Sequence, residues 1–206
     1  MENLIYILFV ALFVPILLMA CLVEKKARQP LIFVLVGTVL SLFASEVNAY
    51  LRNVLPMSAF EITIIVTPIT EEILKAFPIL LFATMFTPKK EALFTASMAV
   101  GIGFAVLENA YYMLIDASFN MFDAVIRAFG AGLMHGMCTL LVGVGILFVK
   151  KKRKLFVVGT FAMLSTAITY HGIYNMLVQS NFRAVGYLLP IATYIPFMVW
   201  RIRKMK

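Results

Sequence analysis

Long apolar stretches alternate with short polar or charged segments along the whole 206-residue chain. A helix needs ~20 apolar residues to cross the hydrocarbon core of a bilayer. Stretches of this kind occupy residues 4–23, 31–51, 60–86, 92–115, 124–149, 155–178 and 184–200. The pattern predicts an all-α polytopic membrane protein, a bundle of about seven transmembrane helices that forms a single domain over residues 1–206. Within it we expect a core at 65–180 and peripheral helices at 4–23, 31–51 and 184–200.

The third apolar stretch is the longest and is interrupted by Pro68. Proline fits the first turn of a helix, where the missing N–H has no partner to lose, and threonine is a common capping residue. We therefore expect a helix to begin at Thr67 and to run to Phe86. Residues 60–67 would form a bent or interfacial segment that leads into it.

The composition supports a membrane location, and the placement of charge predicts an orientation. Hydrophobic residues make up 63% of the chain, and the formal net charge is +8. Of the 18 Lys and Arg residues, 14 lie between or after the apolar stretches, in segments 24–30, 88–91, 150–154 and 201–206. This placement is typical of topology signals beside a lipid bilayer and not of a protein that binds nucleic acid. Seven spans put all four segments on one side, which predicts an outside N-terminus and a cytoplasmic C-terminus.

A set of ionisable residues lies within the apolar stretches, where each costs roughly 2.5–3.5 kcal/mol near the bilayer centre. Its members are Glu46, Glu71, Glu72, Lys75, Glu108, His135 and His171. Counted along helices from the cytoplasmic charges, five stretches carry a member at one depth, ~22–27 Å above those charges. Scattered structural residues have little reason to share a depth. The pattern predicts a polar layer in the outer half of the membrane, facing a protein interior or a water-filled cavity.

The polar layer has the residue types that activate water. Lys75 is four residues after Glu71 and three after Glu72, and Asn175 is four after His171, so each can share a helical face with its partner. Burial makes a carboxylate a stronger proton acceptor, and N–H groups stabilise an oxyanion. Two histidines and a glutamate also match a common catalytic zinc set with one position open for water. These residues do not decide between metal-bound and metal-free water.

Each of these residues also has a structural interpretation. The pair of Glu71 and Lys75 alone is equally well explained as a structural ion pair, and His135 alone as a hydrogen bond between helices. We interpret Glu46 and Asn48 as structural or as lining a substrate path. The common depth of the whole set is what favours a functional core.

Four motifs, in order on successive stretches, resemble those of the PrsW family of membrane-embedded proteases, distantly related to the CAAX prenyl endopeptidases and bacteriocin-immunity-type proteins. They are EEILK at 71–75, FAVLEN at 104–109, the lone histidine His135 in GLMHGM, and HGIYN at 171–175. The resemblance covers residues 65–180 and implies an intramembrane peptidase. Family members resemble site-1 proteases of stress responses in the bacterial plasma membrane. The implied substrate is a single-pass anti-sigma factor, cut near its extracytoplasmic side so that a sigma factor is activated.

The resemblance implies that Glu71 and Glu72 supply the general base and that Lys75 supports them. Glu71 is favoured by analogy with the CAAX endopeptidases, but the adjacent pair is not resolved. Glu108 would be the second acidic element of the catalytic set. CAAX endopeptidases carry histidine at this place, so their prenylated substrate is not implied here.

The resemblance further implies that His135 and His171 are metal ligands or oxyanion donors. Glu108 would complete the metal set, and Asn175 would join His171 among the catalytic residues. The expected cofactor is a divalent metal such as zinc, with a metal-free glutamic mechanism as the alternative.

Two other functions are compatible with buried Glu, Lys and His residues. A proton- or cation-coupled transporter uses them as relays, but no inverted repeat is visible and the polar layer lies away from the midplane, where transport sites usually lie. A non-catalytic membrane partner is the second alternative, and the complete set of acidic residues and histidines argues against it. We therefore predict a membrane-embedded hydrolase that acts on a membrane-anchored protein.

Overall fold

The computed structural model describes residues 3–115, 120–151 and 156–205, and within these ranges every element is helical. The elements are α1 (Leu4–Leu22), α2 (Lys25–Val54), α3 (Ala59–Glu61), the π-helix η1 (Ile62–Val66), α4 (Thr67–Met85), α5 (Lys90–Ile115), α6 (Met121–Lys151), the π-helix η3 (Phe156–Thr160), α7 (Phe161–Val178) and α8 (Arg183–Met205). Because η1 joins α3 to α4 and η3 runs directly into α7, they form seven helical segments, one for each predicted span. The all-α fold class is confirmed.

Four of the segments, α1, α2, α5 and α6, are long and apolar enough to cross a membrane. Helix α4 does not meet that criterion because its 19 residues include Glu71, Glu72 and Lys75. These three side chains are at most 5% exposed, so neighbouring helices cover the charges. The described helices can therefore form a membrane bundle with the ionisable residues inside it.

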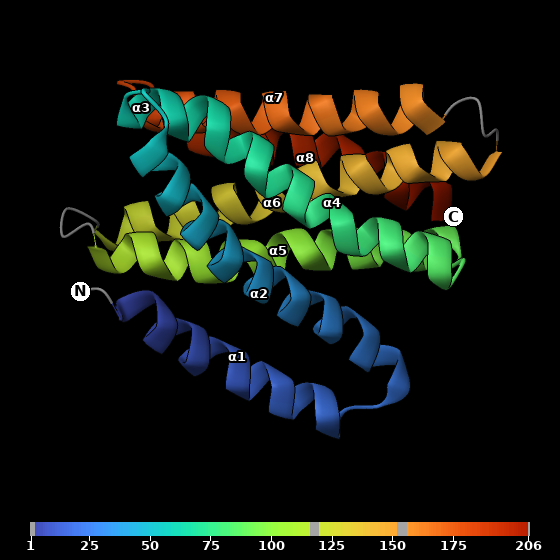
Figure 1. The fold of residues 1–206 in the computed structure, drawn as a ribbon. Helices are drawn as coiled ribbons and strands as arrows, with labels where there is room; N and C mark the ends of the chain where they lie inside the picture. Colours follow the sequence, from blue (N-terminus) through green and yellow to red (C-terminus); the bar gives the residue numbers. More distant parts are fainter. Residues whose placement is uncertain (1–2, 116–119, 152–155, 206) are drawn as a thin grey trace.

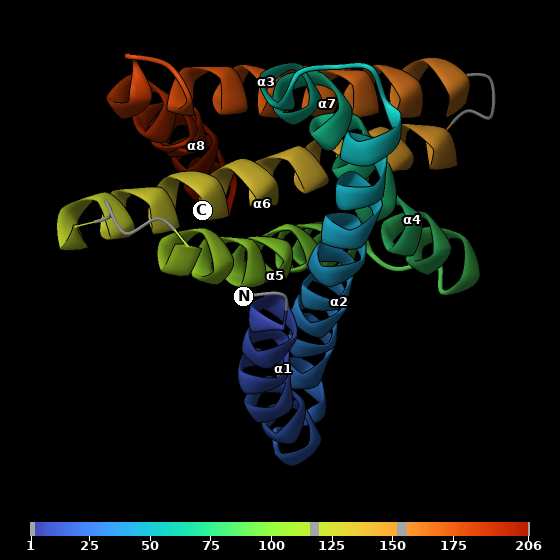
Figure 2. The same ribbon diagram turned by 60° about the vertical axis from the view of Figure 1, so that its left-hand side comes forward.

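Helices α5 and α6 run side by side through the middle of the bundle (Figure 1). Helix α2 packs against α5. Helices α7 and α8 both pack against α6, and α4 contacts α2, α6 and α7. Helix α1 lies at the edge, paired with α2 (Figure 2). The two ends of the chain lie at opposite ends of the bundle (Figure 1). Apolar residues that include Val100, Met134 and Cys138 form the core where α5 meets α6.

Glycines let α5 approach both of its neighbours closely. A Cβ atom at Gly37 of α2 would collide with the carbonyl oxygen of Val100 in α5. On the other side of α5, a Cβ atom at Gly101 would collide with the carbonyl of His135 in α6. This close approach sets the distance between the helices that carry Glu108 and His135.

The third segment begins earlier than expected. Its N-cap is Ser58, whose hydroxyl accepts from the amide of Glu61 while the Glu61 carboxylate accepts from the Ser58 amide, which is a capping box. Thr67 lies inside the helix, and its amide donates to the carbonyl of Ile62, five residues back. The expected helix from Thr67 is present as α4, but its lead-in, α3 and η1, is itself helical, and Thr67 does not cap the helix. The reason is the wider π turn, which accommodates the ring of Pro68 without ending the helix.

Candidate active site

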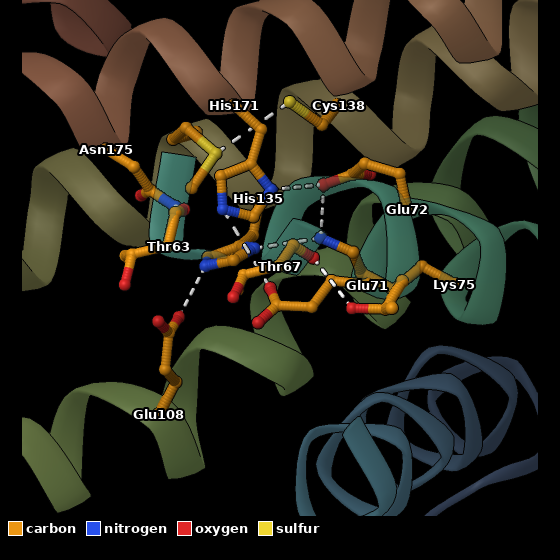
Figure 3. A network of polar contacts seen from close by, with 12 residues as sticks. Thr63, Thr67, Glu71, Glu72, Lys75, Glu108, His135, Cys138, His171 and Asn175 are labelled. Carbon is orange, nitrogen blue, oxygen red and sulfur yellow. Dashed lines mark hydrogen bonds and ion pairs between the residues drawn. The ribbon is translucent and has the colours of Figure 1, made fainter. Parts of the chain in front are cut away.

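Helix α4 contributes a buried ion pair at the centre of the polar cluster. Lys75 Nζ lies 2.6 Å from Glu72 Oε1, and both side chains are fully buried. The same carboxylate oxygen lies 2.8 Å from Nδ1 of His171 in α7 (Figure 3). Because an ionised carboxylate only accepts, this nitrogen carries a proton, and in the neutral imidazole Nε2 of His171 then keeps the lone pair. The ion pair thus fixes the tautomer of a histidine on another helix.

Lys75 also connects this pair to His135 and Glu108. Its ammonium donates to Nδ1 of His135 in α6 at 2.9 Å, because an ammonium has no lone pair with which to accept. The other ring nitrogen, Nε2, then donates to Oε2 of Glu108 in α5 at 2.5 Å. The rings of His135 and His171 lie edge to face with centroids 4.9 Å apart. One continuous set of polar contacts therefore ties α4, α5, α6 and α7 together.

Glu71 is adjacent to Glu72 in the sequence but has different partners. Its Oε1 accepts from Nδ2 of Asn48 in α2 at 3.3 Å, and Asn48 in turn accepts from the hydroxyl of Thr70 at 2.6 Å. Its Oε2 is buried without a hydrogen-bond partner among the described residues. This oxygen lies 3.8 Å from Nε2 of His171, beyond hydrogen-bond distance. A carboxylate oxygen and an imidazole lone pair thus face each other across a short gap.

Glu71, His135 and His171 form a group that can hold a metal ion. One ligand atom from each lies within 4.8 Å of the other two, and two imidazoles with a carboxylate are a common donor set for catalytic zinc. Ligands around one tetrahedral zinc are about 3.3–3.4 Å apart, close to the 3.8 Å between Glu71 Oε2 and His171 Nε2. Metal-binding histidines usually donate their other N–H to a carboxylate, and both histidines contact one here. The donor set and the unpartnered oxygen of Glu71 therefore fit a divalent metal.

Asn175 of α7 contacts the backbone of the π-helix and not the charged residues. Its Nδ2 donates to the carbonyl of Thr63 at 3.0 Å. In an α-helix this carbonyl would accept from the amide of Thr67. Here the Thr67 amide donates instead to the carbonyl of Ile62. The next residue, Pro68, has no N–H to offer. The π turn therefore frees a carbonyl that Asn175 satisfies, and this contact fastens α7 to the start of α4.

Most members of the polar layer predicted from the sequence form a single cluster. The structure brings together Glu71, Glu72, Lys75, Glu108, His135 and His171. Lys75 pairs directly with Glu72, three residues away, and not with Glu71. Glu46 stands apart, because its carboxylate accepts from the hydroxyl of Tyr6 in α1 at 2.6 Å.

Two cavities lie beside the cluster. The larger, about 650 Å³, extends among α2, α3, η1, the start of α4, α5, α6, α7 and α8. The smaller, about 480 Å³, extends among α1, α2, α4 and α5 and is lined by Glu71. Glu108 and Thr67 line both cavities, whereas the pair of Glu72 and Lys75 is not among the described residues that line either. Water or a substrate in these cavities therefore meets Glu71 and Glu108 before it meets the inner ion pair.

Sequence reasoning placed helix α2 at the periphery, yet α2 supplies Asn48 to the cluster. A signal for this was present in the sequence. Ser41, Ser45, Asn48 and Arg52 recur at intervals of four, three and four residues, which places them on one face of a helix. All four line the smaller cavity. A search for polar residues at helical spacing, and not for charge alone, would have placed this face of α2 next to Glu71.

A buried cluster of carboxylates, imidazoles and a lysine, held by several helices and adjoining two cavities, defines a membrane-embedded hydrolase that activates water. The family model described as PrsW family intramembrane metalloprotease matches residues 25–201. The chain therefore belongs to this family and is a membrane-embedded peptidase, which confirms the resemblance seen in the sequence. No curated protein and no solved structure matches the chain.

Proposed function

We propose that the chain cuts a single-pass anti-sigma factor near its extracytoplasmic side, in the plasma membrane of a bacterium, and thereby leads to sigma-factor activation. The reaction is hydrolysis of a peptide bond by an activated water molecule. The observation that carries the proposal is the convergence of Glu71, His135 and His171 from three helices, beside two cavities. Family membership supports the reaction class, and the motif resemblance supports the substrate.

The proposed orientation has the N-terminus outside and the four basic segments in the cytoplasm. The position of the cluster along α2 supports an outer location for the site. Helix α2 begins at Lys25, within a basic segment, and runs to Val54. Asn48, which contacts Glu71, lies 23 residues after Lys25, roughly 35 Å further along the helix. In a hydrocarbon core ~30 Å thick, this depth favours a cut close to the extracytoplasmic surface.

We assign a divalent metal, such as zinc, to Glu71, His135 and His171. When bound, the ion would polarise the peptide carbonyl and acidify a water molecule. His135 can bind it through Nδ1 once that nitrogen gives up its contact with Lys75. Its Nε2–H then continues to donate to Glu108, the arrangement usual for a metal-binding histidine.

Glu108 is the carboxylate that the geometry favours for proton transfer. Its side chain is 21% exposed, it lines both cavities, and its contact with His135 orients it. It takes a proton from the attacking water and returns a proton to the leaving amine. The sequence-based assignment favoured Glu71 as the base without resolving the pair of Glu71 and Glu72, and it placed Glu108 among both the catalytic residues and the metal ligands. The unpartnered oxygen of Glu71 and the accessibility of Glu108 favour Glu71 as the metal ligand and Glu108 as the base.

The remaining cluster residues act by positioning. Glu72 holds His171 in the tautomer that leaves Nε2 free, and Lys75 balances the charge of Glu72 in a place without water. Asn48 orients one oxygen of Glu71. Asn175 fastens the helix of His171 to the π turn. None of these four needs to touch the substrate to affect the rate.

Cleavage of a tagged, single-pass anti-sigma factor by the purified chain in lipid vesicles tests the proposed function. We expect a single cut near the extracytoplasmic side, which Glu71→Ala, Glu72→Ala and His171→Ala each abolish. Glu91→Gln is the matched control, because Glu91 is an exposed carboxylate at the start of α5 that lines neither cavity; this variant should still cleave. If all three cluster variants cleave at the wild-type rate, the proposed function is wrong.

Metal analysis of the purified protein tests the roles assigned to the two carboxylates. We expect one zinc per chain, lost in Glu71→Ala and in the double variant His135→Gln/His171→Gln. Glu108→Gln should retain the metal but fail to cleave. Cleavage by a chain stripped of metal would instead support the metal-free glutamic mechanism, and metal loss in Glu108→Gln alone would restore the sequence-based assignment.

A further inference from the structure

The larger cavity is rich in arginine. Arg52 of α2, Arg127 of α6 and Arg183 of α8 line it, and Glu108 is the one acidic residue among the described residues that do so. The chain has 18 Lys and Arg residues. Fourteen of these lie in the four basic segments, and Lys75 lies in the cluster. The three arginines of the cavity are the remaining basic residues of the sequence. Every basic residue that remains thus lines the larger cavity, although the three come from different helices, and Arg52 lines the smaller cavity as well.

Arg127 is held within the protein and not on its lipid-facing surface. It is 8% exposed, and its guanidinium lies 4.6 Å from the ring centre of Tyr112 in α5. Aromatic rings attract a guanidinium placed over their face and hold it in one orientation. Arg52 and Arg183 are exposed. The cavity therefore has one buried, oriented cation and two accessible ones.

Tyrosine hydroxyls add further hydrogen-bond donors to the same cavity. Tyr112, Tyr174 and Tyr187 all line it. Tyr174 is 2% exposed, and its hydroxyl has no hydrogen-bond partner among the described residues. A buried hydroxyl without a partner is unfavourable. A ligand that accepts hydrogen bonds would relieve this cost.

We propose that this cavity is a subsite for an acidic side chain, Asp or Glu, of the membrane-anchored substrate. The inference rests on the proposed peptidase function and adds the charge of the substrate to it. Arginine forks match a carboxylate in geometry as well as in charge. Glu108, Thr63 and Thr67 line this cavity and also the one that reaches Glu71. A peptide bound at the catalytic cluster would therefore extend into the arginine-lined cavity.

The position of Arg127 along α6 gives the distance of the acidic residue from the cut. Arg127 precedes His135 by eight residues, roughly 12 Å of helix. An extended peptide spans ~3.3–3.6 Å per residue, so this separation corresponds to roughly three or four residues. The acidic side chain thus lies about that far from the scissile bond, on its extracytoplasmic side.

A library of tagged single-pass proteins with randomised outer juxtamembrane residues, co-expressed with the full chain, tests the subsite. Sequencing of the cut products should show Asp and Glu enriched over Asn and Gln at one position, by roughly tenfold, the scale of one charge-assisted hydrogen bond. Arg52→Gln, Arg127→Gln and Arg183→Gln should each reduce this enrichment. Arg183→Glu should shift the preference toward Lys and Arg.

Two features keep the experiment interpretable. Arg127 is buried, so its replacement can impair folding, whereas Arg52 and Arg183 are exposed and test the same preference without that risk. Lys89→Glu is the control for a change of charge. Lys89 is exposed in a predicted cytoplasmic segment and lines neither cavity, so this variant should keep the wild-type enrichment.

The possible failures are distinguishable. If the wild type cuts no member of the library, the proposed function and the subsite both fail. Cutting without acidic enrichment, or enrichment that survives in all three glutamine variants, overturns the subsite alone. A parallel assay in vesicles with and without phosphatidylglycerol addresses a lipid ligand. If the arginines govern a dependence on this anionic lipid and no preference for substrate charge, the cavity binds a headgroup and the inference is wrong.

Discussion

Helices α1 and α4 have the same length, 19 residues, and opposite chemistry. Helix α1 has no Asp, Glu, Lys, Arg or His, and Ala20 is its one buried residue. Helix α4 has Glu71, Glu72 and Lys75 among its buried residues. Its exposed face is mostly apolar and includes Ile69, Ile73, Phe77, Leu81 and Met85. The family match begins at residue 25, so it excludes α1 and includes α4.

The comparison shows that apolarity does not decide which helix occupies the centre of this protein. In lipid, contact with acyl chains satisfies an apolar side chain as well as contact with another helix does, so helices associate through close packing and polar contacts. Charged residues must face the protein interior. The most apolar helix therefore lies at the edge, and the helix with three charges lies inside. Single substitutions at buried polar or closely packed positions, each with a control at an exposed or open position, test this comparison.

The largest effect on stability is expected from the ion pair of α4. Lys75→Met leaves the carboxylate of Glu72 buried without its counter-charge, which should lower the free energy of unfolding by about 3–5 kcal/mol. Val10→Met in α1 alters a side chain that is 56% exposed and should cost less than about 0.5 kcal/mol. Reversible unfolding in mixed detergent micelles measures both. The double variant Glu72→Gln/Lys75→Met should recover some of the loss, and similar losses in Lys75→Met and Val10→Met would contradict the comparison.

The second effect concerns the close approach of α5 and α6. Gly101→Ala places a methyl group against the backbone carbonyl of His135, so the helices must separate at a cost of up to about 3 kcal/mol. Gly132 lies in α6, and a Cβ atom added there would meet nothing within 4 Å. Gly132→Ala should therefore be neutral or slightly stabilising, because alanine favours helix more than glycine does. Unfolding and cleavage should both separate the two variants; a stable, active Gly101→Ala protein would show that the spacing is not critical.

A third and smaller effect is expected at the π turn that begins α4. Asn175→Leu leaves the carbonyl of Thr63 without its side-chain donor, which should cost about 1–3 kcal/mol. Gln179→Leu is the matched control, since Gln179 lies one turn further along and makes an exposed contact with the carbonyl of Asn175. The midpoint temperature of thermal unfolding should be clearly lower for Asn175→Leu than for Gln179→Leu. Equal stabilities would mean that the π turn does not depend on Asn175.

The smallest effect is expected in α1. Tyr6→Phe removes the exposed hydrogen bond to Glu46 and should cost about 1 kcal/mol or less. Tyr50→Phe, at a tyrosine that is 66% exposed, should leave the free energy of unfolding unchanged. Neither change should alter the rate of cleavage. A large loss of cleavage in Tyr6→Phe would show that α1 contributes to the reaction and would break the contrast with α4.

Much of the fold was predictable because the solvent imposes it. Each predicted apolar stretch corresponds to a helical segment, and most boundaries agree within a few residues. Helices α2 and α8 extend further than expected, since their basic end residues remain helical outside the apolar stretch. The start of α4 at Thr67 was predicted, but the helical lead-in through α3 and η1 was not, because a π turn leaves no pattern in composition. Only the capping pair, Ser58 and Glu61, marked where that lead-in begins.

The two adjacent glutamates show where sequence reasoning stops. Neighbouring residues in a helix point about 100° apart, so Glu71 and Glu72 cannot share an environment. Both stand at a spacing that lets them pair with Lys75. Which of the two glutamates pairs with Lys75 depended on the positions of His171 and Asn48, which come from helices distant in the sequence. Spacing within α4 carried no information about either.

The sequence by itself determined that this protein is a helical membrane bundle with its charged residues enclosed, because lipid tolerates neither unpaired backbone groups nor isolated charges. It also determined the motifs that place the chain among the PrsW proteases. The tertiary structure decided which residues meet. It placed Glu72 in the inner ion pair, turned Glu71 toward His135 and His171, and gathered arginines from three helices around one cavity. Those contacts depend on how the helices cross, which is set by close packing at glycines and by a π turn, and neither can be read from hydropathy or charge.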